Sequence, residues 1–365
     1  MIETPPADEA VLRPALSQVA VGALVSVGVL FVTVGASAQF FNLSWGLWFS
    51  EVFVFLAVPF IAIAATGRRP SRLTGLDQRP VPGLAAGFVV GALNYAAWAV
   101  PLMWAAERLF PKSLVERFSS ARLFERQTGV ELVLLITGVT LAAPFCEEFL
   151  YRGLVQPGLS RRVSMARSIV VTALLFSLMH FDPVGFLARF ELGLVFGLLA
   201  WRGGSLWPAI GAHAANNLTS VVIFLIVGRD DSELPGWLVA ALVVGGNLGL
   251  VTWLVGLRRW SWWVAPVPAA DEPAPFAPFF RSVAPWAVAA LLALITLAVV
   301  DRRGVELNII DLMHPVPAPK SDASPGEKAA WEDLQQLRAK ARRGEFGFDE
   351  YRSYRQLAAE KPPEE

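Results

Sequence analysis

The sequence has 365 residues, of which 55% are hydrophobic and only 17% charged, and its mean hydropathy is +0.50. An average soluble domain is about 45–50% apolar and about 25% charged, so this composition excludes a soluble globular protein and a disordered chain. The 31 basic residues balance 31 acidic ones, which argues against a nucleic-acid partner held by a basic surface. Cys146 is the only cysteine, so neither an internal disulfide nor a cysteine-based zinc site is expected. The composition indicates a membrane protein with several spans.

Apolar stretches that approach the length of a membrane span recur along the chain. A spanning helix needs about 20 mostly apolar residues. The sequence predicts eight or nine such helices, at residues 15–40, 46–66, 81–104, 131–157, 165–182, 184–201, 205–228, 236–257 and 284–300. A proline-rich connector separates the last one from the others. Because lipid requires an internally bonded backbone and no alternating pattern favours a barrel, we expect an all-α polytopic transmembrane helix bundle with a small soluble C-terminal helical tail.

Arginine-rich loops predict the orientation of the bundle. The loops at 67–80 and 152–167 are rich in Arg, and both lie on the cytoplasmic side if the N-terminus is cytoplasmic. Residues 36–38 resemble a signal-peptide cleavage site, but the apolar run before them is too long, so an uncleaved first span is preferred. The richness in Ala, Gly and Arg is typical of a GC-rich bacterial genome. We therefore expect a multi-pass protein of the bacterial inner (cytoplasmic) membrane with a cytoplasmic N-terminus.

The chain divides into four predicted regions. Residues 1–130 hold N-terminal spans and, over 105–130, an amphipathic helix on the membrane surface. Residues 131–228 form the central spans, 229–303 the C-terminal spans with the proline-rich connector, and 304–365 the soluble tail.

The tail carries the signature of a helix start. Ser324 and Glu327 have the spacing of a capping box, which predicts a helix that runs to Arg343 and ends at Gly344. Asp349 is placed to cap a second short helix through Leu357. This arrangement resembles the two-helix appendage of many bacterial membrane proteins, and a solvated charged tail is the alternative.

Charged side chains inside a span are costly and usually mark function, and the span at 131–157 contains three of them. Glu148 and Arg152 are four residues apart, so they share a helix face and can pair. Glu147 points about 100° away and remains free for chemistry. A buried ion pair that merely joins helices would explain Glu148 and Arg152 but not Glu147.

Two of the three histidines of the chain lie in the spans that follow. His180 is near the end of a short apolar helix, and His213 and Asn217 share a helix face four residues apart. Taken singly, each has a structural explanation as a packing residue or interhelical hydrogen bond. Together with the Glu pair, they can bind a divalent metal, or use Glu as a base on water while His and Asn stabilise an oxyanion. Either arrangement favours peptide hydrolysis.

These three groups match, in order and type, the motifs of a known family. The segments Glu147-Glu148-x-x-x-Arg152, Phe176-x-x-x-His180 and His213-x-x-x-Asn217 resemble those of the CPBP intramembrane proteases, which include CaaX prenyl endopeptidases and bacteriocin-processing (Abi) proteins. The resemblance covers residues 131–228.

The resemblance implies a role for each residue. Glu147 activates the water with His180 as its partner, and Glu148 and Arg152 orient Glu147. His213 and Asn217 hold the oxyanion, with Asn216 as a rival to Asn217. The family has been described both as zinc and as metal-independent glutamate proteases; no His-Glu-x-x-His pattern is present, so we prefer no cofactor. If zinc is bound, the expected ligands are Glu147, His180 and His213.

The predicted function is thus an intramembrane endopeptidase that cleaves a hydrophobic peptide or a membrane-anchored protein within the lipid bilayer. The alternative is a non-catalytic membrane protein, such as a bacteriocin-immunity factor or a scaffold. A transporter is a third possibility, but it predicts internal repeats, and none is detected. The sequence names no partner for the tail.

Overall fold

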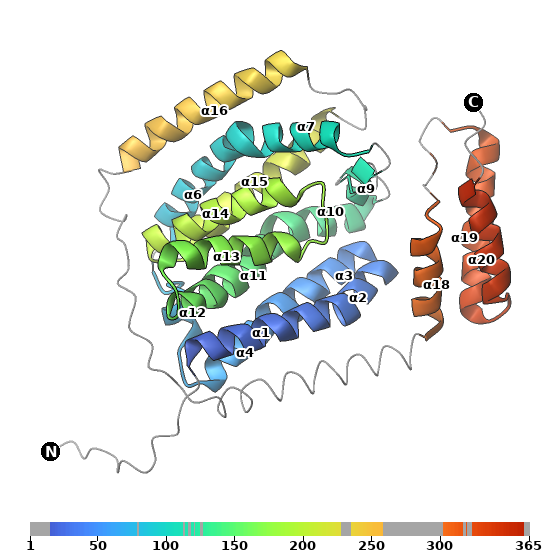
Figure 1. The fold of residues 1–365 in the computed structure, drawn as a ribbon, viewed down its shortest axis with the longest axis horizontal. Coiled ribbons are helices and arrows are strands. Elements are labelled where there is room, and N and C mark those ends of the chain that lie inside the picture. Colours follow the sequence, from blue (N-terminus) through green and yellow to red (C-terminus); the bar gives the residue numbers. More distant parts are fainter. Residues whose placement is uncertain are drawn as a thin grey trace, which may run out of the picture. The chain divides into compact units, whose positions relative to one another are not determined.

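The computed structural model describes residues 15–78, 80–111, 114–115, 118–119, 121–124, 127–227, 235–257, 302–316, 319 and 323–360. The chain divides into two compact units, Met1–Ala290 and Leu291–Glu365, each with its own hydrophobic core (Figure 1). Every regular element among the described residues is a helix, which confirms the predicted all-α fold.

The first unit consists of helices that often continue through a π-helical turn rather than ending in a loop. Its elements are α1 (Leu16–Leu30), η2 (Phe31–Gly35), α2 (Ala36–Phe41), α3 (Leu43–Phe49), η3 (Ser50–Leu56), α4 (Ala57–Ala65), α5 (Pro70–Leu73), α6 (Pro80–Asn94), η4 (Tyr95–Ala99), α7 (Val100–Leu109), α9 (Ala121–Phe124), α10 (Gly129–Thr137), η5 (Gly138–Ala142), α11 (Ala143–Leu150), η6 (Tyr151–Val155), α12 (Gln156–Ser160), α13 (Met165–Leu178), α14 (Phe186–Gly203), α15 (Trp207–Val227) and α16 (Gly236–Leu257). The first eight predicted spans agree with these helices to within a few residues, except that α13 ends before His180. The predicted span at 284–300 lies outside the described residues.

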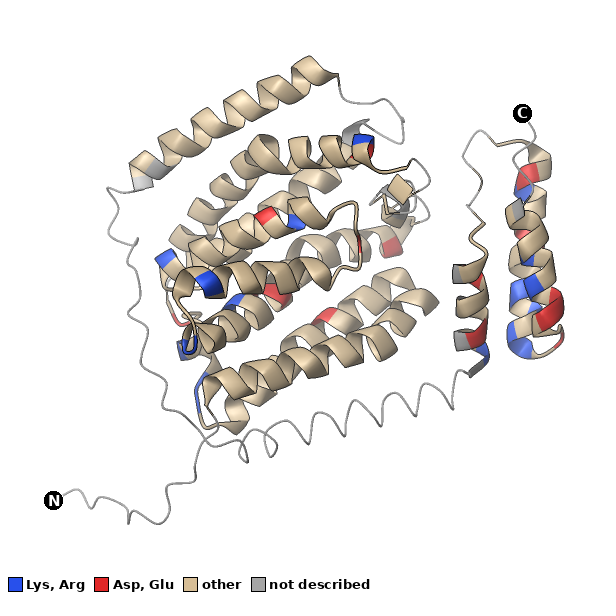
Figure 2. Ribbon diagram, in the orientation of Figure 1, with Lys and Arg blue, Asp and Glu red and all other residues tan. Residues whose placement is uncertain are grey.

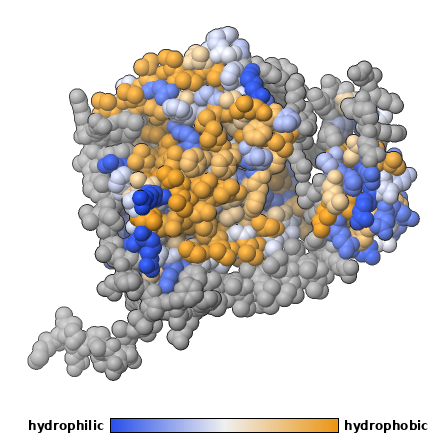
Figure 3. Space-filling model, viewed as in Figure 1, coloured by the Kyte–Doolittle hydropathy of each residue, from blue (hydrophilic) through white to orange (hydrophobic). Residues whose placement is uncertain are grey.

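Five helical segments among the described residues are long and apolar enough to cross a bilayer: Leu16–Phe41, Leu43–Ala65, Pro80–Leu109, Gly129–Ser160 and Gly236–Trp253. Charged residues are sparse along these helices (Figure 2), and apolar side chains cover a broad face of the unit (Figure 3). Large apolar residues such as Phe53, Leu141 and Leu248 are exposed on the surface, as expected where lipid replaces water. The protein is therefore a multi-pass membrane protein.

The predicted amphipathic helix over 105–130 is wrong as a single helix. Helix α7 ends at Leu109, and Phe110 is extended with ψ 152°. The cause is Pro111, because the residue before a proline is disfavoured in the helical conformation. Beyond it, α9 is one short turn, and Thr128 is extended again before α10 begins.

Small residues let α6 and α14 pack closely against α15 and α13, the helices of the third and second motifs. Helix α6 packs along α15. A Cβ on Gly87 would collide with the carbonyl of Pro208, and one on Gly91 with the carbonyl of Ala212. Helix α14 approaches α13 in the same way, since a Cβ on Gly193 would lie 2.8 Å from that of Ala173. Such close approach is typical of helix packing in membranes, where small residues let backbones meet.

The described residues of the second unit form helices α18 (Arg302–Met313), α19 (Pro325–Arg343) and α20 (Phe348–Glu360). The capping box at Ser324 and the end at Gly344, with φ 82°, are as predicted. Helix α20 begins before Asp349, so this residue lies in the first turn rather than at the cap. Helix α18 was not predicted, and its Leu307 and Ile310 form the core with residues of α19 and α20.

Candidate active site

The Glu pair lies in the middle of a continuous helical segment from α10 to α12. Glu148 is fully buried, and its Oε1 accepts a hydrogen bond from Arg152 Nη1 at 2.8 Å. The predicted pairing of these two residues is therefore confirmed. Arg152 lies in the π-helical turn η6, and it still reaches Glu148 four residues earlier. Such turns are frequent at functional sites.

His213 joins this ion pair from helix α15. Its Nδ1–H donates to the same Glu148 Oε1 at 3.0 Å. The ring stacks on Phe196 with centroids 4.8 Å apart and meets Phe176 edge to face. A carboxylate oxygen with two donors fixes the orientation of the imidazole and leaves Nε2 as the ring atom available for chemistry.

Arg152 also connects the motif helix to α14. Its Nη2 donates to the carbonyl of Gly193 at 3.0 Å, and one turn later Gln156 Nε2 donates to the carbonyl of Gly197 at 2.9 Å. The guanidinium carbon lies 4.6 Å from the centroid of the Phe176 ring. These contacts hold the buried cation in place, as a charge inside a bilayer requires.

His180 follows the C-terminal end of α13. Its Nδ1 lies 2.9 Å from the carbonyl oxygen of Phe176. Because a carbonyl only accepts, Nδ1 carries the proton and Nε2 of the neutral ring is the free acceptor. The Phe176 ring packs against both histidines, with centroids 5.0 Å from His180 and 5.8 Å from His213.

The segment after His180 has a constrained backbone. Phe181 adopts a left-handed conformation with φ 52°, which is unusual for a bulky residue and is found most often at functional sites. Asp182 Oδ1 accepts the backbone N–H groups of Val184 and Gly185, and Oδ2 pairs with Arg189. This network holds the turn that presents His180.

Glu147 differs from its neighbour in its surroundings. The residue is 9% exposed, and its Oε2 has no hydrogen-bond partner among the described residues. Within the same part of the chain, no hydrogen bond joins Glu147 to His180 directly, but Arg189 and His213 interact electrostatically with both residues. The site therefore separates a paired carboxylate, Glu148, from an unpaired one, Glu147.

The two asparagines of the third motif bond to each other and to η5. Asn217 Nδ2 donates to the carbonyl of Val139 at 2.8 Å, and Asn216 Nδ2 donates to Asn217 Oδ1 at 3.2 Å. Asn217 on α15 is thus hydrogen-bonded to η5, the segment that precedes the Glu pair. Its amide nitrogen keeps a second hydrogen for another acceptor.

The alternative zinc set does not have the arrangement of a metal site. In the ranges that the structure describes, no group of three or more His, Cys, Asp or Glu side chains is placed to hold a metal ion. Glu147, His180 and His213 therefore do not form a three-ligand cluster in this arrangement.

Sequence reasoning missed several polar residues in this region. Glu51 lies in the second span, in η3, and is buried. The signal that identified Glu147, an ionisable residue inside an apolar span, was also present at Glu51. Gln156, Asp182 and Arg189 were missed as well, because only the packing of α14 shows what they contact.

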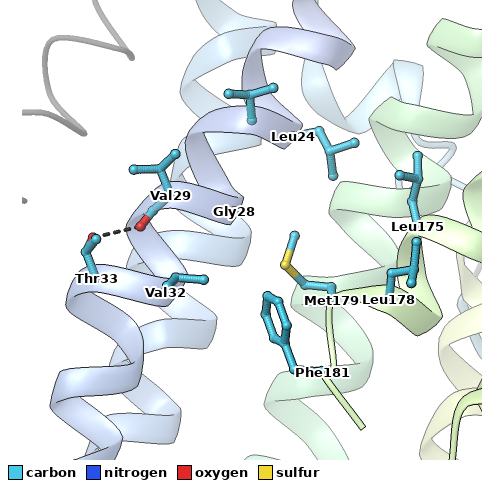
Figure 4. A pocket seen from close by; sticks show the side chains of 10 residues that line it. Leu24, Gly28, Val29, Val32, Thr33, Leu175, Leu178, Met179 and Phe181 are labelled. Carbon is cyan, nitrogen blue, oxygen red and sulfur yellow. Dashed lines mark hydrogen bonds between the residues drawn. The ribbon is translucent and has the colours of Figure 1, made fainter. Parts of the chain in front are cut away.

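An apolar groove lies beside His180. It is lined by α1 and η2 on one side and by the end of α13 on the other, with Met179 and Phe181 projecting into it (Figure 4). Its volume is about 520 Å³. Thr33 is the only lining residue with a polar side chain, and its hydroxyl donates to the carbonyl of Val29 at 2.7 Å. The groove therefore offers an apolar surface next to a motif histidine.

The comparisons with known proteins agree with the motifs. Residues 129–219 match the family model described as type II CAAX prenyl endopeptidase Rce1-like. The matched segment begins with α10 and ends in α15, and it includes all six motif residues: Glu147, Glu148, Arg152, His180, His213 and Asn217. This match confirms the predicted family resemblance, and the family is one of proteases. No curated protein and no solved structure gives a significant match.

Proposed function

We propose that the Rce1-like domain is the catalytic domain of an intramembrane endopeptidase in which Glu147 activates a water molecule. The observation that carries the proposal is the unequal use of the two carboxylates. Glu148 Oε1 accepts hydrogen bonds from both Arg152 and His213, and only its Oε2 lacks a partner, whereas the Glu147 carboxylate accepts no hydrogen bond from any described residue. A general base needs a lone pair that no structural bond occupies.

The chemistry follows from the free atoms of the site. Glu147 takes a proton from water, and His180 Nε2 orients this water as a second acceptor. The resulting hydroxide adds to the peptide carbonyl carbon and forms a tetrahedral oxyanion. The C–N bond then breaks, and Glu147 returns the proton to the leaving nitrogen. Glu148 and Arg152 serve to orient the helix face from which Glu147 acts.

His213 and Asn217 are the proposed oxyanion donors. Since His213 Nδ1–H donates to Glu148, Nε2 can donate only when the ring carries both protons. The Glu148 carboxylate stabilises this imidazolium, as a buried carboxylate does for a catalytic histidine. Asn217 contributes its second amide hydrogen, and Asn216, which bonds to it, is the alternative.

Glu147→Gln tests this proposal directly. We expect cleavage of a panel of quenched-fluorescent apolar peptides by the protein in liposomes to fall about 10²- to 10⁴-fold, the usual loss when a general base is removed. Glu191→Gln is the matched control, because Glu191 lies on α14 and bonds to Asn94 rather than to any motif residue. Full activity of Glu147→Gln would exclude the mechanism. Inactivation by a chelator with recovery on adding zinc would exclude its metal-independent form.

The proposed substrate is a hydrophobic peptide or a membrane-anchored protein. The groove beside His180 supports this class, since its lining leaves no free polar side-chain group for a polar substrate to bind. We further propose that the protein resides in a bacterial inner membrane with its N-terminus in the cytoplasm, which the arginine-rich loops favour.

One observation favours the alternative of a non-catalytic membrane protein. The bonds among Glu148, Arg152 and His213 join helices α11, α14 and α15, as a structural contact would. This explanation leaves Glu147 and the free Nε2 of His180 without a role. A Glu147→Gln protein that retains the cellular phenotype of the wild type would favour the alternative.

A further inference from the structure

Glu51 is a second buried carboxyl group that the proposed mechanism does not use. It lies in η3 of the span Leu43–Ala65, and it is only 3% exposed. Its Oε2 has no hydrogen-bond partner among the described residues. A buried polar atom without a partner costs free energy, and an unpaired carboxylate in lipid costs far more.

The described segments that pack closely on Glu51's element, η3, carry other acids but no cation. Helix α11, which carries the Glu pair, packs against η3. The other described segments packed closely on η3 are α1, η2, α2, α3, α4 and η5, and none of these seven segments contains Lys, Arg or His. Their titratable side chains are Cys146, Glu147 and Glu148, all on α11. Glu51 interacts electrostatically with Glu147 and with the Cys146 thiol.

Orphaned carboxyl oxygens thus lie on two elements that pack against each other, one on Glu51 of η3 and one each on Glu147 and Glu148 of α11. Two carboxylates in one buried site do not both ionise readily, and a shared proton is the usual solution. Arg152 makes no hydrogen bond to Glu51 or to Glu147: its Nη1 and Nη2 donate to Glu148 and to Gly193, and its Nε has no partner among the described residues. If one acid is neutral, its O–H can donate to the other, and both orphaned atoms gain a partner.

We propose that Glu51 is a positioning residue that remains a neutral carboxylic acid and donates a hydrogen bond to the Glu147 carboxylate. This inference rests on the proposed function, because it assigns the ionised state to Glu147 as the base. The O–H of Glu51 then fixes the orientation of the Glu147 carboxylate and leaves its other lone pairs for water. Glu51 itself touches neither water nor substrate.

The test compares two substitutions of Glu51 in the full-length protein. Glu51→Gln keeps the shape and a donor group, whereas Glu51→Leu removes the donor and suits the apolar surroundings. We expect kcat for the quenched-fluorescent peptides to fall less than about 10-fold in Glu51→Gln and about 10- to 100-fold in Glu51→Leu, with KM little changed, as for the loss of a hydrogen bond to a charged group. Equal losses in the two variants, or full activity of Glu51→Leu, would overturn the proposal.

Tyr151 provides a matched comparison, because its buried hydroxyl also lacks a partner in the described structure and interacts electrostatically with Glu147. If Tyr151→Phe loses activity while Glu51→Leu does not, the donor is the tyrosine and the proposal is wrong.

A second measurement does not depend on catalysis. The infrared difference spectrum between the wild type and Glu51→Gln at neutral pH should contain the carbonyl stretching band of a protonated carboxylic acid. If this band is absent, Glu51 is ionised and the proposal is overturned, whatever the activity. If the band is present but Glu147→Gln is fully active, the proposed function fails and the neutral state of Glu51 stands.

Discussion

Glu148 Oε1 accepts hydrogen bonds from two residues on different parts of the bundle, Arg152 at 2.8 Å and His213 at 3.0 Å. Through this one oxygen atom, the Glu pair is hydrogen-bonded to His213 of the third motif. The other oxygen of Glu148 has no partner among the described residues. Any substitution that removes one of the two donors leaves the negative charge of the buried Glu148 carboxylate less compensated. This lowers the stability of the fold and changes the surroundings of His213.

Arg152→Met tests the effect of removing one donor from the Glu148 carboxylate. We expect the variant to lose about 3–5 kcal/mol of stability, the typical cost of breaking a buried ion pair from one side. The double variant Glu148→Gln with Arg152→Met removes both charges and should recover part of this loss, but not peptide cleavage, because His213 then lacks its carboxylate. Thermal unfolding in detergent measures the stabilities. A double variant no more stable than Arg152→Met would contradict the prediction.

At the scale of elements, α1 packs against α12, η6 and α4, and the apolar groove lies between α1 and the end of α13. A Cβ on Gly28 would lie 3.5 Å from the terminal methyl of Met179, so a flexible side chain fills the gap between the two helices there. Methionine adapts its shape readily. A rearrangement of the Met179 side chain can therefore change the free space in the groove without any shift of the helices that carry the Glu pair.

Leu178→Trp tests whether the groove admits substrate. Leu178 lines the groove and is 51% exposed, whereas Leu174, one turn earlier on α13, is 39% exposed and does not line it. We expect Leu178→Trp to lower kcat/KM for apolar peptides about 10-fold by filling the groove, equivalent to about 1.4 kcal/mol of binding. Leu174→Trp is the matched control and should stay within about twofold of wild type. Equal effects of the two variants would exclude entry by this route.

At the scale of the whole molecule, the second unit has a polar centre of its own. Asp311 on α18 accepts hydrogen bonds from Arg338 Nε at 2.6 Å and from the Tyr351 hydroxyl at 2.7 Å, and it pairs with Arg355 at 3.0 Å. Burial, followed by the bond to Asp311, raises the pKa of Tyr351 to about 12. Because the pKa of Tyr351 in the folded protein is higher than the ordinary value of about 10, the neutral Tyr351 hydroxyl contributes to the stability of the fold. This contribution is complete below about pH 10 and is lost as the pH rises through about 12.

Asp311→Asn should weaken this unit without affecting the bundle. The change leaves two partly buried arginines with a poorer acceptor, so we expect a loss of about 1–3 kcal/mol. Hydrogen exchange of α18–α20 in the full chain measures the effect, and peptide cleavage should not change. Asp349→Asn is the matched control, because the Asp349 side chain is 94% exposed and its pair with Arg352 lies on the surface. Equal exchange in the two variants would contradict the prediction.

Most of the helices can be predicted from the sequence, because whether a segment is buried in lipid depends on the length and hydropathy of that segment alone. The apolar runs therefore match helices such as α1 and α16 closely. The contact between His213 and Glu148 was not predictable, because it depends on how α15 packs against α6 and α11. Helix α18 was missed for a similar reason, since its apolar face has meaning only against α19 and α20.

The π-helical turns on either side of α11 have a consequence for how related chains are compared. A helix rotates about 100° per residue, and a π turn holds one residue more than an α turn. Loss of a single residue from η5, such as the outward-facing Leu141, would close the π turn to an α turn, so the segments on either side would keep nearly the same relative orientation. Loss of a residue from α11 before Glu147 would instead rotate everything before it by about 100° relative to Glu147, including Val139, the partner of Asn217. A gap in an alignment of related chains therefore preserves the site when it falls in η5 and changes it when it falls in α11.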